Sequence, residues 1–98
     1  MYIRYGKEIP GFLYINRINS KLLVISAGSG NPFEFIDVLN KAIAASASKI
    51  KSKVVEVYLD LLSCLGDRSN RFAKMIYNQN TRQIDPFSLK NIKKETLP

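Results

Sequence analysis

The chain has 98 residues, of which 46% are hydrophobic, so it fits a single modest globular domain and not a disordered segment. Its net charge of +7 favours an anionic partner, such as nucleic acid, an acidic protein or an anionic membrane, without choosing among them. The absence of histidine argues against zinc enzymes and histidine-dependent hydrolases. The single cysteine, Cys64, cannot form an internal disulfide and fits a reducing, cytoplasmic setting.

The first 19 residues contain scattered apolar side chains interrupted by Gly6, Pro10 and Gly11. Because proline and glycine interrupt a strand ladder, the pattern fits either two short strands or one strand and a loop. Residues 21–27 follow as a short, continuously apolar run. Such a run predicts a strand that is buried on both faces of a sheet.

A helix is predicted over residues 32–47. Asn31 can cap its start, and Pro32 suits the first helical position. Apolar residues then recur at spacings of three and four, which places them on one helical face. They are Phe35, Ile36, Leu39, Ala42, Ile43, Ala47 and Ile50. The lysines that follow suit the negative end of the helix dipole.

The clearest strand pattern lies at residues 54–62, where every second residue is apolar. One face of this strand should therefore pack against the helix. The apolar set is Val55, Val57, Leu59 and Leu61. The order of strand, helix and strand predicts that residues 54–62 pair parallel with residues 21–27 through a right-handed crossover.

A hairpin is predicted after this strand, because residues 66–70 supply glycine and the short polar side chains that reverse a chain. A second strand, residues 71–77, should pair antiparallel with the first. Asp60 lies in an apolar run, where an ionised carboxylate needs a partner, and Arg68 and Arg71 lie across the turn. We therefore expect an ion pair that holds the hairpin in register and not a lone catalytic aspartate.

A last strand is predicted around Phe87, interrupted by Pro86. Together the elements predict an α+β fold, a small mixed β-sheet of four to five strands with one main helix packed on one face. A single domain should cover residues 1–98. Its core should lie at about residues 21–92, followed by a flexible tail at 93–98.

The sequence contains no cluster of metal ligands, no nucleophile with a neighbouring base and no complete phosphate-binding loop. We therefore predict no catalytic residue, no cofactor and no metal. No apolar run approaches the roughly 20 residues needed to cross a bilayer, so no membrane partner is predicted. Basic and aromatic residues alternate at places such as Arg71, Phe72 and Lys74. This alternation permits contacts with single-stranded RNA but is also typical of any strand with a solvated basic face.

Several short motifs recur in one family of known proteins. They are Asn31-Pro32 before an amphipathic helix, Asp60-Leu61-Leu62 at the end of a strand, Gly66 in the turn, and Asn70-Arg71-Phe72 after it. Over about residues 22–92, this arrangement resembles the antitoxins of the RnlB family, which are partners of RNase LS type toxins in bacteria.

The resemblance implies a small cytoplasmic antitoxin that neutralises an endoribonuclease toxin by direct protein–protein binding, with no catalysis of its own. Its candidate partner-binding residues lie at the predicted turn, where polar side chains project from the end of a hairpin. They are Arg68, Asn70, Arg71 and Phe72. The alternative, from composition, is a small basic RNA- or DNA-binding protein.

Overall fold

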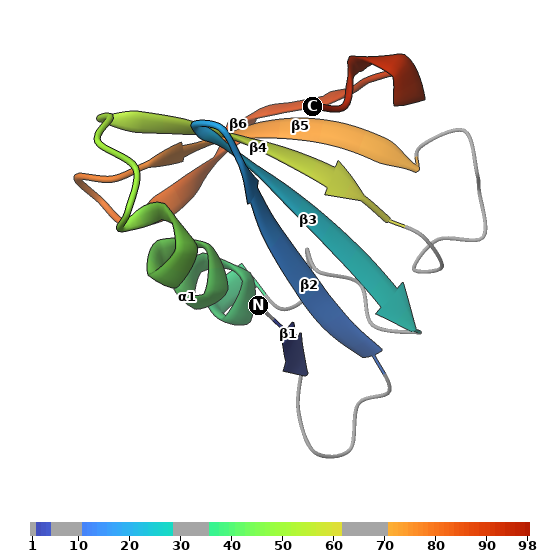
Figure 1. Ribbon diagram of the computed structural model, residues 1–98, viewed down its shortest axis with the longest axis horizontal. Helices are drawn as coiled ribbons and strands as arrows, with labels where there is room; N and C mark the ends of the chain where they lie inside the picture. The colour runs from blue at the N-terminus through green and yellow to red at the C-terminus, as the bar shows by residue number, and fades with distance from the viewer. Residues whose placement is uncertain (1, 5–10, 29–35, 62–70) are drawn as a thin grey trace.

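The computed structural model describes residues 2–4, 11–28, 36–61 and 71–98, and it contains six strands and one α-helix in these ranges. In chain order these elements are β1 (Tyr2–Arg4), β2 (Gly11–Ile18), β3 (Lys21–Gly28), α1 (Ile36–Ala47), β4 (Val54–Asp60), β5 (Phe72–Asn78) and β6 (Gln83–Asn91). The six strands form one mixed sheet, and α1 lies against one of its faces (Figure 1). The predicted α+β class is confirmed.

The order of strands across the sheet follows the order in the chain, from β1 to β6. The sheet has one strand more than the upper number expected, because the N-terminal segment forms both β1 and β2. Neighbouring strands are antiparallel except β3 and β4, which pair parallel as predicted. The sheet is therefore two antiparallel three-stranded meanders joined edge to edge, with α1 in the connection between them.

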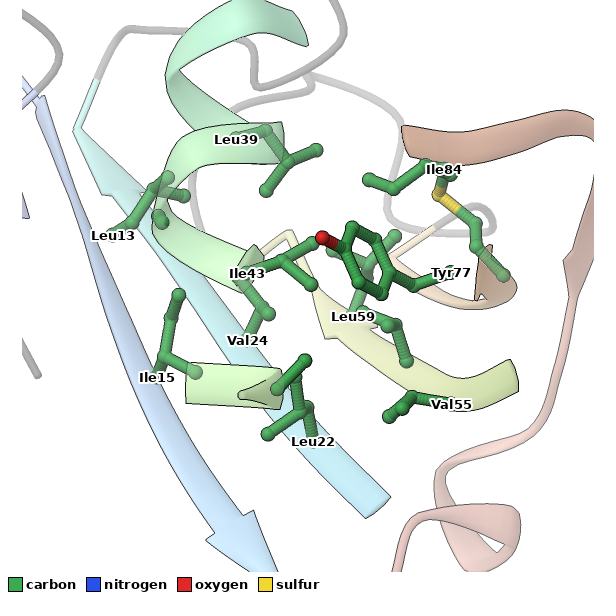
Figure 2. Close-up of a cluster of buried hydrophobic side chains, with 14 of the residues drawn as sticks. Leu13, Ile15, Leu22, Val24, Leu39, Ile43, Val55, Leu59, Tyr77 and Ile84 are labelled. Atoms are coloured by element: carbon green, nitrogen blue, oxygen red, sulfur yellow. The ribbon is translucent and has the colours of Figure 1, made fainter. Parts of the chain in front are cut away.

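The core lies between α1 and the sheet. Leu39 and Ile43 of α1 are fully buried and point toward the strand side chains (Figure 2). One continuous cluster contains residues of the helix, of β2 to β6 and of the segment after α1: Leu13, Ile15, Leu22, Val24, Leu39, Ala42, Ile43, Ala47, Ile50, Val55, Val57, Leu59, Ala73, Met75, Tyr77 and Ile84. The predicted packing of the alternating apolar residues of β4 against the helix is thus confirmed for Val55, Val57 and Leu59.

The burial of β3 differs from the prediction. Leu22 and Val24 are fully buried, but Leu23 and Ile25 on the other face are only half-buried. The expectation of burial on both faces was wrong because, among the described residues, a helix covers only the face that carries Leu22 and Val24. A continuous apolar run is therefore compatible with a sheet that is covered on one side.

Several sequence predictions concern residues outside the described ranges. They are the helix start at Asn31 and Pro32, the turn at residues 66–70, and Cys64. The predicted tail contains a short 3₁₀ helix, Lys94–Thr96, with no buried residue.

Replacing Leu59 with alanine should strongly destabilise the protein. Leu59 is fully buried at the centre of the sheet, so its truncation removes apolar contacts and leaves a cavity that costs about 2–5 kcal/mol. That is a large part of the roughly 5–15 kcal/mol that stabilises a typical domain. Urea denaturation monitored by circular dichroism measures the change.

The control is Val54→Ala in the same strand, because Val54 is 50% exposed. This substitution should change the free energy of unfolding by less than about 0.5 kcal/mol. A Leu59→Ala variant that unfolds at the urea concentration of the parent would contradict the central position of β4 in the core.

Candidate interaction surface

The sheet face opposite α1 carries a second set of side chains, which we call the open face. Alternation along each strand places them there, and the strand register sets Leu23, Tyr58 and Lys74 side by side, as it does Ile25, Asp60 and Phe72. The open face consists of Tyr14, Asn16 and Ile18 of β2, Lys21, Leu23 and Ile25 of β3, Glu56, Tyr58 and Asp60 of β4, and Phe72, Lys74 and Ile76 of β5. No described helix covers it, and most of these side chains are half-buried.

Tyr58 lies at the centre of the open face. It is only 4% exposed although it is not part of the core beneath α1. The ammonium groups of Lys21 and Lys74 lie 5.6 Å and 5.5 Å from the centre of its ring, within the range of a cation–π interaction. Its hydroxyl donates a hydrogen bond of 3.4 Å to Glu56 Oε2. Among the described residues, Tyr58 is thus covered by lysine side chains and not by a helix.

Glu56 holds both of these lysines. Lys74 Nζ donates a hydrogen bond of 2.8 Å to Glu56 Oε1, and Lys21 Nζ lies 3.4 Å from Glu56 Oε2. The hydrogen bond from Lys74 is the main reason that the pKa of Glu56 is lowered, and the same bond raises the pKa of Lys74. The two lysines of the open face are therefore paired with a carboxylate.

The predicted ion pair between Asp60 and Arg71 is confirmed. Arg71 Nε lies 2.8 Å from Asp60 Oδ1 and Arg71 Nη2 lies 3.2 Å from Asp60 Oδ2, so the guanidinium binds both oxygens. The Arg71 guanidinium also lies 4.9 Å from the centre of the Phe72 ring. Two of the four candidate partner-binding residues, Arg71 and Phe72, are therefore together at this corner of the open face. The other two, Arg68 and Asn70, lie outside the described residues.

A bulge in β6 adds an exposed aromatic residue beside the open face. The register between β5 and β6 shifts between Lys74 and Ile76, and the Ile76 N–H donates to Ser88 Oγ at 2.8 Å in place of a ladder bond. Pro86 cannot donate a ladder hydrogen bond, which explains why the irregularity occurs here. Phe87 is left 96% exposed.

A shallow groove lies next to this phenylalanine. It is lined by Lys74, Ile76, Phe87, Ser88, Leu89 and Lys90. Sequence reasoning placed Phe87 in a strand but missed its exposure, for which the neighbouring Pro86 was the available signal. The groove connects Phe87 to the open face through Lys74 and Ile76.

Comparison with known proteins gives no relative: no protein-family profile and no curated protein sequence matches the chain. Within the described ranges there is no group of three or more side chains that could hold a metal ion. No described helix is long and apolar enough to cross a bilayer.

Replacing Arg71 with alanine should lower the melting temperature. The Asp60 carboxylate is only 15% exposed and would lose both hydrogen bonds from the guanidinium, at a cost of about 1–3 kcal/mol. In a domain of this size, each kcal/mol corresponds to a shift of roughly 4–8 °C. Thermal denaturation at neutral pH measures the shift.

The matched control is Arg17→Ala, because Arg17 is exposed and lies outside the open face. This control should melt within about 4 °C of the parent, since exposed substitutions rarely exceed about 0.5 kcal/mol. Equal melting temperatures for Arg71→Ala and the parent would show that the ion pair does not stabilise the hairpin.

Replacing Glu56 with glutamine should reduce the loss of stability in acid. Because the folded-state pKa of Glu56 is lowered from 4.5, its ionised form favours folding above that pH. This contribution is lost as the pH falls through the lowered pKa. Urea denaturation of parent and variant at pH 7 and pH 3 should show a smaller difference between the two pH values for Glu56→Gln. An equal difference in both proteins would contradict the coupling between Glu56 and the lysines.

Proposed function

We propose that the protein is a binding module without catalysis of its own, an antitoxin that neutralises an endoribonuclease toxin by direct contact through the open face. The observation that carries the proposal is the open face itself, which combines half-buried apolar side chains with charges that are already paired. The setting we propose is the cytoplasm, as the resemblance to the RnlB family implies.

The composition of the open face suits a protein partner. Protein interfaces have an apolar and aromatic centre, are enriched in tyrosine, phenylalanine and arginine, and have a polar rim. The open face has Tyr58 at its centre, Phe72 at the corner beside Arg71, and Tyr14, at 40% exposure, on the side of β2. Phe87 projects almost completely into solvent at the other side. Burying Tyr14, Phe72 and Phe87 against a partner would remove apolar surface from water.

The charges of the open face argue against a phosphate backbone as its ligand. Lys21 and Lys74 are paired with Glu56, and Arg71 is paired with Asp60. A phosphate would have to compete with these carboxylates for the cations and would be repelled by them. A protein surface with apolar side chains meets no such competition.

The resemblance supplies the class of partner. A toxin that cleaves RNA needs a cationic groove for its substrate, and a chain with a net charge of +7 would be repelled by that groove at long range. An apolar contact through a face whose charges are paired avoids this repulsion. We therefore place the contact outside the substrate groove of the toxin, with neutralisation by steric or conformational means.

Replacing Phe87 with alanine should weaken toxin binding without changing the melting temperature. A side chain that is 96% exposed contributes little to folding, but an aromatic anchor at an interface contributes about 2 kcal/mol or more, which is roughly 30-fold in Kd. The toxin candidate is the product of the adjacent reading frame, co-expressed and co-purified with this chain. Titration calorimetry then gives the two affinities.

Lys41→Ala is the control, because Lys41 is exposed on α1, on the opposite side of the sheet. It should bind like the parent. Failure to isolate any complex with the neighbouring gene product would remove the antitoxin proposal. A complex that is weakened neither by Phe87→Ala nor by Tyr14→Ala would support the toxin as the partner but would show that it does not bind through the open face.

A further inference from the structure

One end of the molecule gathers five exposed cations, which we call the basic end. It is the end at which the β2–β3 turn, the connection from α1 to β4 and the β5–β6 turn meet, at the left of the sheet in Figure 1. The topology brings them together because β3 and β4 both begin there while β2, α1 and β5 end there. The five residues are Arg17, Lys49, Lys51, Lys53 and Arg82, and all are exposed.

Two hollows and one backbone hydrogen bond bring Arg17, Lys49, Arg82 and the backbone of Lys53 close together. Arg17 and Lys49 line a hollow between β2 and the last turn of α1, together with Ala45. Ala45 also lines the neighbouring hollow that contains Arg82. The backbone N–H of Gln79 donates to the Lys53 carbonyl at 2.9 Å, which fixes the start of β4 beside the β5–β6 turn.

No described carboxylate pairs with these five cations. Glu56 and Asp60 are occupied by the lysines and the arginine of the open face. Asp37 lies in the first turn of α1, at its other end, and Glu95 lies in the 3₁₀ helix that follows β6. Asp85 accepts a hydrogen bond from the Phe87 N–H at 2.9 Å. Within the described ranges, the basic end thus differs from the open face in that its charges are unpaired.

The side chains of Lys49, Lys51 and Lys53 are not needed as hydrogen-bond donors to the carbonyl groups at the C-terminal end of α1. Gln79 Nε2 donates hydrogen bonds of 3.0 Å and 2.8 Å to the carbonyl oxygens of Ala47 and Ile50. A neutral amide from the β5–β6 turn therefore satisfies carbonyl groups of the kind that basic side chains often cover at a helix C-terminus. Arg82 also occupies a position with a φ of 56°, a conformation that glycine or asparagine adopts more readily than arginine.

We propose that the basic end binds the phosphate backbone of a nucleic acid duplex. Five cations with no described carboxylate partner could contact a row of phosphates, and counterion release would drive the association. Single strands are bound largely by stacking bases on exposed aromatic rings, but Tyr77, which lies beside Arg82 in this region, is only 1% exposed. Of the apolar side chains beside these lysines, Ile50 is buried and Val54 is 50% exposed, so little apolar surface is present to insert into a lipid bilayer. The five residues of this site are not part of the proposed toxin contact.

The experiment measures duplex binding by fluorescence anisotropy over a series of salt concentrations. The longest dimension of the molecule, 34 Å, spans about 10 base pairs at roughly 3.4 Å per base pair, so duplexes of about 20 base pairs offer a complete site. The probes are an RNA duplex, a DNA duplex and a single strand, all of the same sequence, and vesicles containing anionic lipid. The RNA and DNA arms decide which duplex is the preferred ligand.

The test variant is the triple substitution Lys49→Gln, Lys51→Gln, Lys53→Gln. With five phosphate contacts on a DNA duplex, the slope of log K against log salt should be about −4.5, and it should fall to about −2 in this variant. The affinity in 0.1 M salt should fall about tenfold or more. The control, Lys41→Gln, Lys93→Gln, Lys94→Gln, removes the same charge from exposed positions outside the basic end and should change affinity by less than about threefold.

Equal losses in the two triple variants would overturn the site, because only net charge would then matter. Tighter binding to the single strand or to vesicles than to either duplex would also overturn the proposal. Loss of duplex binding in the test variant alone, with an unchanged melting temperature, would support it. None of these outcomes depends on whether a toxin binds the open face.

Discussion

The parallel pairing of β3 with β4 is the constraint on which the rest of the structure depends. It joins two antiparallel meanders into one sheet, and its register sets Leu22 beside Val57 and Val24 beside Leu59 beneath α1. The same register aligns the opposite face, where Leu23 lies beside Tyr58. A shift of one residue would exchange the two faces and bring polar side chains beneath the helix. The core and the open face are therefore two consequences of one pairing.

The fold separates the cationic side chains into two groups, one paired with carboxylates and one with no described carboxylate partner. On the open face, cations are paired with carboxylates and extend over aromatic rings, as Lys21 and Lys74 do over Tyr58. At the basic end, cations from the end of β2, the α1–β4 connection and the β5–β6 turn lie together with no described carboxylate among them. A net charge of +7 does not reveal this separation, because it sums paired and unpaired groups alike. The separation is what allows each surface to be assigned a different class of ligand.

Sequence patterns predicted most elements of the fold and the parallel pairing of β3 with β4, but not the grouping of residues that lie far apart in the chain. Alternation along one strand predicted β4, and the position of Asp60 in an apolar run predicted its pairing with Arg71. The breaks at glycine and proline left the N-terminal segment undecided, because a three-residue strand such as β1 carries almost no pattern. The basic end could not be predicted, since its cations lie at positions 17, 49, 51, 53 and 82 and meet only through the sheet topology.

The two proposed surfaces can act at the same time. The open face is one broad side of the sheet, whereas the basic end lies where the strands end and the connections between them meet. A protein bound to the open face would therefore leave the basic end uncovered. Lys21 lies at their border, because it starts β3 beside the β2–β3 turn but its ammonium lies 3.4 Å from Glu56 Oε2. Exposed charges further apart than about 8 Å are largely screened at physiological salt. Direct electrostatic coupling between the two proposed surfaces would therefore run through Lys21 and Glu56, because a protein that binds Glu56 would free Lys21 as a sixth cation beside the basic end. By thermodynamic reciprocity, a nucleic acid that attracts Lys21 would then favour that protein by the same factor.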